Sequence, residues 1–315
     1  MLSKIFSLSF LTSLIAGTIR LATPILIPAL GQVLTQRAGV LNLSVEGCML
    51  MGAVCGFSAA SISGNLWIGL LCGIGAGILF SLIMAWLSVT VRANQVIAGI
   101  GLNIFATGLA AYVYRVVFGI RSLPEQIETF PTLSIPGLSS IPVIGTIFFQ
   151  HNWIVYFAFF ILLPFTFFVL EKTTFGLAIK AVGENPRAAD SKGINVGGVR
   201  YAAVLIGGAY AGFGGAFMTL AYLNSYTDSV IGGRGYIAVS VVILARFLPQ
   251  RAMWGALLFG FASALQLRFQ AMGVPVPSQI LLMLPYVATI IALVFASRKA
   301  QMPRAYAVPY SRMER

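Results

Sequence analysis

The side chains that could do chemistry in this sequence gather in one stretch, FGLAIKAVGENPRAADSKGINVGGVR, at residues 175–200. The stretch separates two long apolar runs and carries charges of both signs. Its charged residues are Lys180, Glu184, Arg187, Asp190, Lys192 and Arg200. Groups of this kind are either solvated or engaged in ion pairs and hydrogen bonds with a partner.

A short helix is predicted inside this stretch, over roughly residues 186–192. Asn185 can cap free backbone N–H groups, Pro186 suits the first helical position, and Gly193 is a natural stop. A second amphipathic piece, FGLAIKAVG, precedes it. A purely solvated loop has no need of a capped helix, whereas a short rigid helix of mixed charge suits docking into a cleft on a partner and can transmit that partner's motion.

Other polar side chains lie within the apolar runs, where a polar group is costly and tends to face a cavity or another helix. Glu46 could accept a hydrogen bond from a ribose hydroxyl or a base, or it could pair with Arg20, Arg37 or a helix start. Asparagine and glutamine offer both donors and acceptors, which suits a neutral polar solute. The candidates for a solute path are Asn42, Glu46, Asn103 and Gln266.

Catalytic and nucleotide-binding patterns are missing from the sequence. The only histidine, His151, has no neighbouring carboxylate, and neither HExxH nor GxSxG occurs. The three cysteines lie in apolar runs without metal-ligand spacing, and no GxxxxGK[ST] loop is present. We therefore expect no catalytic residue, no metal and no cofactor, and we expect any energy source to lie in another subunit.

Membrane helices must position these groups. Of 315 residues, 58% are hydrophobic and only 9% are charged, against about 25% in a soluble domain. Long continuous apolar runs in lipid favour helices over barrel strands. The sequence thus predicts an all-α, polytopic integral membrane protein with one transmembrane domain over residues 1–315 and about 8–10 transmembrane helices. The candidate spans are 6–32, 41–61, 66–90, 95–118, 153–170, 201–222, 235–247, 252–272 and 278–297.

The run at 235–247 is too short to cross a bilayer comfortably and follows a glycine cluster, which indicates a broken or re-entrant helix. Its sequence RGYIAVSVVILARF is weakly similar to EGCMLMGAVCGF at residues 46–57. An internal repeat and a coincidence of apolar composition are both open.

Basic residues set the expected orientation. The net charge of +12 is spread over the ends of apolar runs, which argues against nucleic acid and for topology signals beside membrane lipid. The segments 171–200 and 298–315 are therefore assigned to the cytoplasm and the loop 119–152 to the outside. Nine simple spans would put Lys4 outside, so either the amino terminus is outside or an early run does not cross.

The motif AVGENPRAADSKGINV (181–196) resembles the cytoplasmic coupling segment of ABC-transporter permeases of the branched-chain amino acid and simple-sugar class. The resemblance extends over most of the chain, and its closest branch is the nucleoside-type permeases that use a binding protein of the basic membrane protein kind. The loop 121–152 falls outside it. The further matching stretches are QRAGVLNLSVEGCMLMGA (36–53), RANQVIAGIGLNIFATGL (92–109), GGRGYIAVSVVILARFLPQ (232–250) and GALLFGFASALQLRFQ (255–270).

This resemblance implies a pore subunit of an ABC importer in the bacterial inner membrane, working by alternating access. It implies cytoplasmic ATPase subunits, a second permease in a heterodimer, and an extracytoplasmic solute-binding protein as partners. The residues implied to seat in the ATPase are Lys180, Glu184, Asn185, Pro186, Arg187, Ala189, Asp190 and Gly193. Nucleosides, riboflavin-like molecules and sugars remain open as solutes. The alternative is a self-sufficient secondary transporter or channel for a small polar solute, for which Glu46 is the one deep acidic candidate.

Overall fold

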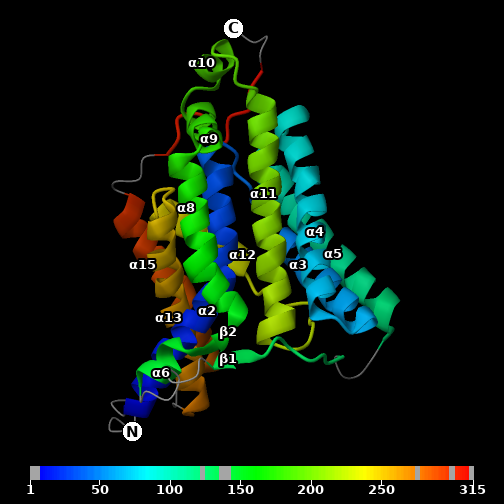
Figure 1. The fold of residues 1–315 in the computed structure, drawn as a ribbon, viewed down its shortest axis with the longest axis vertical. Helices are drawn as coiled ribbons and strands as arrows, with labels where there is room; N and C mark the ends of the chain where they lie inside the picture. The colour runs from blue at the N-terminus through cyan, green and yellow to red at the C-terminus, as the bar shows by residue number, and fades with distance from the viewer. Residues whose placement is uncertain (1–7, 121–124, 135–142, 274–276, 298–301, 312–315) are drawn as a thin grey trace.

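The computed structural model describes residues 8–120, 125–134, 143–273, 277–297 and 302–311 (Figure 1). Helices account for most of these residues. The described part of the chain holds one small antiparallel sheet, in which β1 (Thr132–Ser134) pairs with β2 (Gln150–Asn152). The prediction of an all-α, polytopic fold is confirmed.

Seven helical segments among the described residues are long and apolar enough to cross a membrane. They form because lipid offers no partner to backbone polar groups, so each group must be satisfied within its own helix. The segments are α2 (Leu8–Arg37), α3 (Val45–Ser63), α4 (Leu66–Ala85) with a π-helical extension (Trp86–Thr90), α5 (Gln95–Phe118), α7 (Trp153–Tyr156) joined to α8 (Leu163–Lys172) by a π-helical stretch (Phe157–Leu162), α11 (Val196–Phe217) with a π-helical extension (Met218–Tyr222), and α13 (Pro249–Ala271).

The two remaining predicted runs form shorter helices. As expected, α12 (Arg234–Leu244) is too short to cross alone. The candidate span over 278–297 is divided in two, because α14 (Ser278–Leu282) ends at Leu282 and α15 (Leu284–Ser297) begins two residues later. Pro285 lies at this break, where its missing N–H cannot continue the helical hydrogen-bond ladder.

The helices define two ends of an elongated bundle (Figure 1). We call one the α10 end: it carries α9 (Thr174–Glu184), α10 (Pro186–Ser191) and the C-terminal segment. The opposite α6 end carries the start of α2, α6 (Ile144–Phe148) and the small sheet. Since α2 runs from the α6 end to the α10 end, Leu8 and α10 lie at opposite ends of the bundle.

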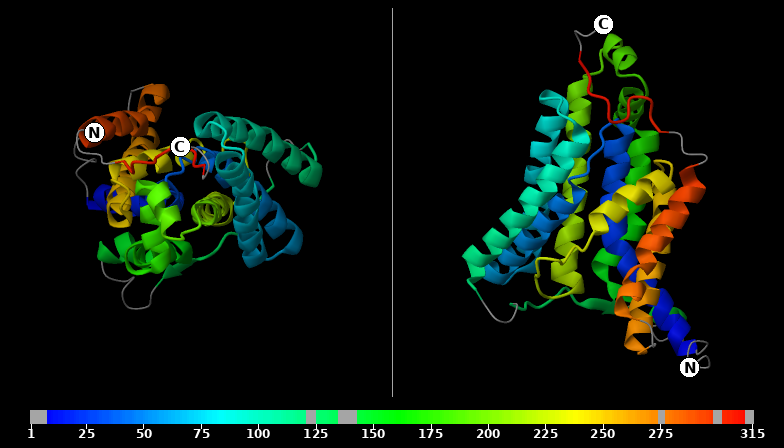
Figure 2. Two further views of the ribbon diagram at one scale, coloured as in Figure 1. Left: turned by 90° about the horizontal axis from the view of Figure 1, so that it is seen from above. Right: turned by 180° about the vertical axis from the view of Figure 1, so that it is seen from behind.

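Helix α11 lies at the centre of the bundle. Figure 2 shows α3, α4 and α5 grouped on one side of it and α12, α13 and α15 on the other. Glycines let α11 approach its neighbours closely: a Cβ built on Gly77 of α4 would lie 2.6 Å from the Cα of Gly212 and would also meet the carbonyl oxygen of Gly208. Small residues at such crossings are the usual means of tight packing between membrane helices.

This crossing can be tested within a single helix. We expect Gly77→Ala to lower the free energy of unfolding by about 1–3 kcal/mol, because the added methyl group forces α4 and α11 apart. Gly75→Ala is the matched control, since a Cβ at Gly75 meets no atom within 4 Å; it should leave stability unchanged or slightly raised. Thermal unfolding in detergent measures both, and equal midpoints for the two variants would contradict the close crossing.

Candidate functional site

The predicted short helix at the α10 end is present. Helix α10 covers Pro186–Ser191, with Pro186 at its first position. The Oδ1 atom of Asn185 accepts a hydrogen bond from Ala188 N at 3.1 Å, and Gly193 adopts a left-handed φ of 84° just after the helix. Cap, proline and glycine thus act as the sequence predicted, and α10 projects beyond the membrane helices (Figure 1).

Lys180 and Glu184, both predicted coupling residues, form ion pairs with other described residues. Lys180 Nζ lies 2.6 Å from Glu171 Oε2. Glu184 Oε1 lies 3.9 Å from Arg37 Nη1, at the end of α2, and the Glu184 side chain is half exposed. Such an exposed ion pair contributes at most about 1 kcal/mol to stability. Glu184 can therefore leave Arg37 and bind a partner protein at little cost in free energy.

The coupling residues differ in burial and fall into three groups. Ala189 is buried and packs with Val182 and Val196, so it fixes the position of α10 and offers no surface for docking. Lys180, Pro186 and Asp190 are partly exposed. The residues of this segment that are exposed are Glu184, Asn185, Arg187, Ala188, Ser191, Lys192 and Gly193.

Inside the bundle, the starts of α3 and α12 face each other. The carboxylate of Glu46, in the first turn of α3, spans the start of α12: Oε1 accepts from Gly233 N at 2.8 Å and Oε2 accepts from Gly235 N at 2.7 Å. The first N–H groups of a helix lack intrahelical partners and attract negative charge. Of the interpretations that the sequence left open for Glu46, its side chain here serves the helix start.

Asn103 of α5 completes this connection. Its Nδ2 donates to Leu43 O and Tyr236 Oη, both at 2.8 Å, and its Oδ1 accepts from Gly47 N at 2.8 Å. One side chain thereby joins α5 to the starts of α3 and α12. Asn103 lies eight residues after Gln95, the first residue of α5, or about 12 Å along the helix, so the connection lies well inside the bundle.

Asn42 lies next to Leu43, whose carbonyl oxygen accepts the hydrogen bond from Asn103. Its side chain is fully buried, and its Oδ1 accepts from Ser44 N at 2.9 Å and from Ser44 Oγ at 2.7 Å. Its Nδ2 has no hydrogen-bond partner in the described part of the chain. We call this site the helix-start junction; its members are Asn42, Glu46, Asn103, Gly233, Gly235 and Tyr236. The last three were missed in the sequence, where the GGRGY motif indicated a helix break but not a set of N–H donors.

Gln266 lies apart from the junction, in a cavity of about 230 Å³ on the other side of the α12 start. Arg234, Ser263 and Tyr286 also line this cavity, together with apolar side chains of α2 and α14. The side chains of Ser263 and Gln266 are half-buried and make no hydrogen bond to any described residue. We call this space the Gln266 cavity.

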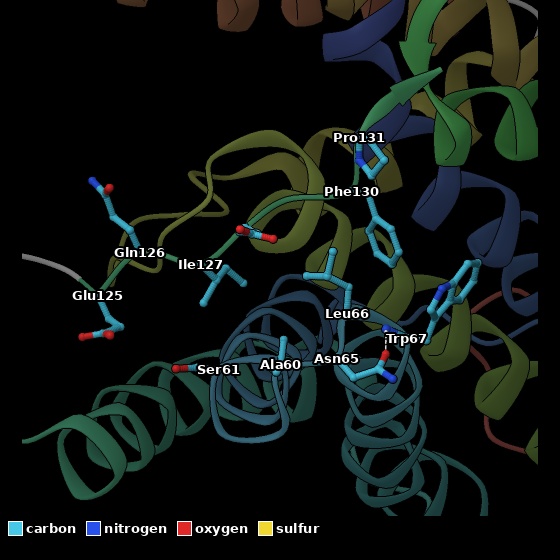
Figure 3. Close-up of a pocket in the computed structure, with 12 residues that line it drawn as sticks. Ala60, Ser61, Asn65, Leu66, Trp67, Glu125, Gln126, Ile127, Phe130 and Pro131 are labelled. Atoms are coloured by element: carbon cyan, nitrogen blue, oxygen red, sulfur yellow. Dashed lines mark hydrogen bonds between the residues drawn. The ribbon is translucent and has the colours of Figure 1, made fainter. Parts of the chain in front are cut away.

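The α6 end holds a larger cavity of about 550 Å³ (Figure 3). It lies between the end of α3, the start of α4 and the segment 125–131, which corresponds to part of the predicted outer loop. At one end of the cavity the rings of Trp67 and Phe130 meet edge to face, with their centroids 5.2 Å apart. Glu125 and Gln126 lie at the other end (Figure 3). The segment is tied to α11's extension by a hydrogen bond from Phe130 N to Leu220 O. The rest of the loop at 121–124 and 135–142 lies outside the described residues.

His151 in β2 has a structural position. It is buried, and its Nε2 lies 2.7 Å from Ile147 O. Burial lowers the pKa of His151 below its ordinary value of 6.5, so the ring stays neutral near pH 7. No group of three or more potential metal ligands occurs among the residues that the structure describes.

Comparison with known proteins gives consistent matches. Residues 14–293 match the family described as "Branched-chain amino acid transport system / permease component". A guanosine ABC transporter permease of Bacillus subtilis is 35% identical over 313 residues, covering 97% of this chain and 98% of that protein. A nucleoside ABC transporter permease of Lactococcus lactis is 36% identical over 307 residues, covering 94% and 96%. A provisionally named glucose ABC transporter permease of Haloferax volcanii is 39% identical over 269 residues, covering 84% and 80%. No solved structure matches the chain.

Proposed function

The chain belongs to the family of branched-chain amino acid transport system permease components, and we propose that it forms part of the pore of an ABC importer for nucleosides. It is a permease component of an ABC transporter and a multi-pass protein of the plasma membrane. The nucleoside assignment is supported by two relatives named for nucleosides, each similar over nearly its full length.

The observation that carries the ABC mechanism is the α9–α10 unit. The capped helix α10 stands beyond the membrane helices and exposes Arg187, and the residues flanking it, Glu184 and Lys192, are exposed as well. We propose that this end faces the cytoplasm, that α10 seats in an ATPase subunit, and that ATP hydrolysis there drives alternating access. A second permease would complete the pore, and an extracytoplasmic binding protein would deliver the solute at the α6 end.

For the solute path, we propose that Gln266 contacts the solute directly and that the junction residues act through the α12 start. Gln266 and Ser263 have unused hydrogen-bonding capacity inside a membrane protein, which is costly unless they face water or a polar solute. Amide and hydroxyl groups match the hydroxyls of a ribose and the edges of a base. Asn42, Glu46 and Asn103 already bond to the chain itself, so they hold the frame around this path.

The solute assignment is tested by uptake into proteoliposomes that hold this permease, its companion permease and the ATPase, with the binding protein outside. Labelled guanosine should enter only when ATP is supplied inside, and excess unlabelled adenosine should compete while glucose should not. Competition by glucose alone would replace the nucleoside assignment with a sugar. Uptake by the chain alone, without ATP and under an ion gradient, would favour the secondary-transporter alternative.

Gln266 can be tested against a residue of the same type on the same helix. We expect Gln266→Leu to lower guanosine uptake about tenfold, because a hydrogen bond of about 1.5 kcal/mol to the solute is lost. Gln270→Leu is the matched control, since Gln270 lies one turn further along α13 and does not line the Gln266 cavity. Uptake rates at equal membrane levels measure the effect, and equal rates for the two variants would remove Gln266 from the path.

A further inference from the structure

The C-terminal segment Met302–Tyr310 lies across the α10 end of the bundle and does not project away from it (Figure 1, Figure 2). We infer that this segment, which we call the strap, is a mechanical link that passes displacement of α10 to α2 and to the central helix α11. The inference rests on the proposed seating of α10 in an ATPase.

Two backbone hydrogen bonds attach the strap to the elements that must move together. Ala305 N donates to Gly183 O at 2.9 Å, at the end of α9. Ala307 N donates to Gly39 O at 2.9 Å, in the turn that follows α2. The two donors are only two residues apart, so the strap cannot follow α9 without pulling on the turn after α2.

Tyr306 lies between these donors and anchors the strap in the bundle. Its hydroxyl donates to Gln36 Oε1 at 3.0 Å, in the last turn of α2. Its ring meets the ring of Phe247 edge to face, with centroids 5.8 Å apart. Phe247 is fully buried and follows α12, so this one side chain reaches both α2 and the end of α12.

Arg200 provides the attachment to α11. Its side chain is 1% exposed, although it carries a charge. Its Nη1 donates to Val308 O of the strap at 3.0 Å, and its Nε and Nη2 have no partner among the described residues. The strap carbonyl is therefore the partner that the described chain offers to this buried guanidinium, and a hydrogen bond to a charged group is stronger than a neutral one, at about 1.5–3 kcal/mol.

The α9–α10 unit also contacts the bundle directly. The ion pairs of Glu184 with Arg37 and of Lys180 with Glu171 join α9 to α2 and α8, and Val182 and Ala189 pack against Val196, the first residue of α11. The strap adds four hydrogen bonds and an aromatic contact. Together they reach α9, α2 and the turn after it, α11, and Phe247, which lies three residues after the end of α12. The strap is thus a second route, beside the direct packing of α9 and α10 on the bundle, by which motion at α10 can reach the solute path.

The test compares single substitutions on the strap in the complete transporter, reconstituted with its ATPase, companion permease and binding protein. Tyr306→Ala should lower the number of guanosine molecules taken up per ATP hydrolysed about fivefold, while ATPase co-purification is unchanged. Tyr306→Phe, which keeps the ring, should show a smaller loss. Val308→Ala is the matched control, because that side chain is exposed and its carbonyl is retained; its ratio should equal that of the unaltered transporter.

An unaltered uptake ratio in Tyr306→Ala would overturn the strap inference while leaving the proposed function standing. Failure of the unaltered transporter to take up guanosine with ATP would overturn both. Amide hydrogen exchange on the isolated permease gives a measurement independent of transport and of the folding of any variant. The N–H groups of Ala305 and Ala307 should exchange slowly, and exchange at the rate of a free peptide would also overturn the inference.

Discussion

Replacing Glu46 with Ala is expected to abolish guanosine uptake and to lower the thermal midpoint of the permease in detergent. The carboxylate accepts from Gly233 N and Gly235 N, and its removal leaves two buried donors without partners at about 1–3 kcal/mol each. The start of α12 would then lose its position beside α3. Uptake in the full transporter and unfolding of the purified permease measure the two effects.

Glu46→Gln makes this prediction more specific. The amide has one oxygen and one NH2 group in place of two acceptors, so one of the two N–H donors stays unpaired and an intermediate loss of stability should follow. Glu128→Gln is the matched control, since Glu128 is exposed at the α6 end, and it should leave stability unchanged. A Glu46→Gln variant that loses uptake yet unfolds like the unaltered protein would contradict the structural role and favour a proton-carrying carboxylate, as in a secondary transporter.

The second large effect is expected at α10. Replacing Glu184, Arg187 and Asp190 together with Ala should release the ATPase subunit during purification and reduce uptake to the level without ATP. At a docking surface a minority of side chains cost more than about 1 kcal/mol each when truncated. Removing three charged side chains together should therefore weaken binding of the ATPase about tenfold, which corresponds to about 1.4 kcal/mol.

A conservative triple variant controls for damage to the fold of this unit. Glu184→Asp, Arg187→Lys and Asp190→Glu keep every charge, and Ala189, which holds α10 against Val182 and Val196, is unchanged in both variants. The conservative variant should retain more ATPase than the alanine variant. If the alanine variant keeps both its ATPase and its uptake, α10 is not the coupling helix.

The effects of these variants bear on one another. The Glu46 prediction concerns the frame of the solute path, the α10 prediction concerns the delivery of force, and the strap lies between them. A transporter that loses uptake but keeps its ATPase would indicate a fault at the helix-start junction or in the strap, whereas loss of both indicates a fault at α10.

Much of the α10 end could be predicted from the sequence because its structure is local. Asn185, Pro186 and Gly193 each act on a backbone group within a few residues of themselves, so neighbouring letters suffice to predict the helix and its limits. The membrane helices were equally accessible, because long apolar runs in lipid have one way to satisfy their backbones. The short α12 also followed from length and glycine content.

The helix-start junction was decided by tertiary structure alone. Asn42, Glu46, Asn103 and Gln266 were recognised as polar residues in apolar surroundings, but nothing in the sequence indicated that Asn103 bonds to Gly47 and Tyr236 or that Gln266 lies in a separate cavity. The partners of Glu46 are 187 and 189 residues away along the chain. Such a pairing depends on which two helix starts meet inside the bundle.

The same distinction holds for the strap. From its sequence the strap could be recognised only as part of a basic tail. Its hydrogen bonds to Gly39, Gly183 and Arg200 depend on how three distant elements are placed in the fold. Composition determined that this chain is a helical membrane protein, and local motifs determined the short helix α10. The packing of the helices decided which buried polar groups meet, because in lipid each such group takes whichever partner the fold brings within hydrogen-bonding distance.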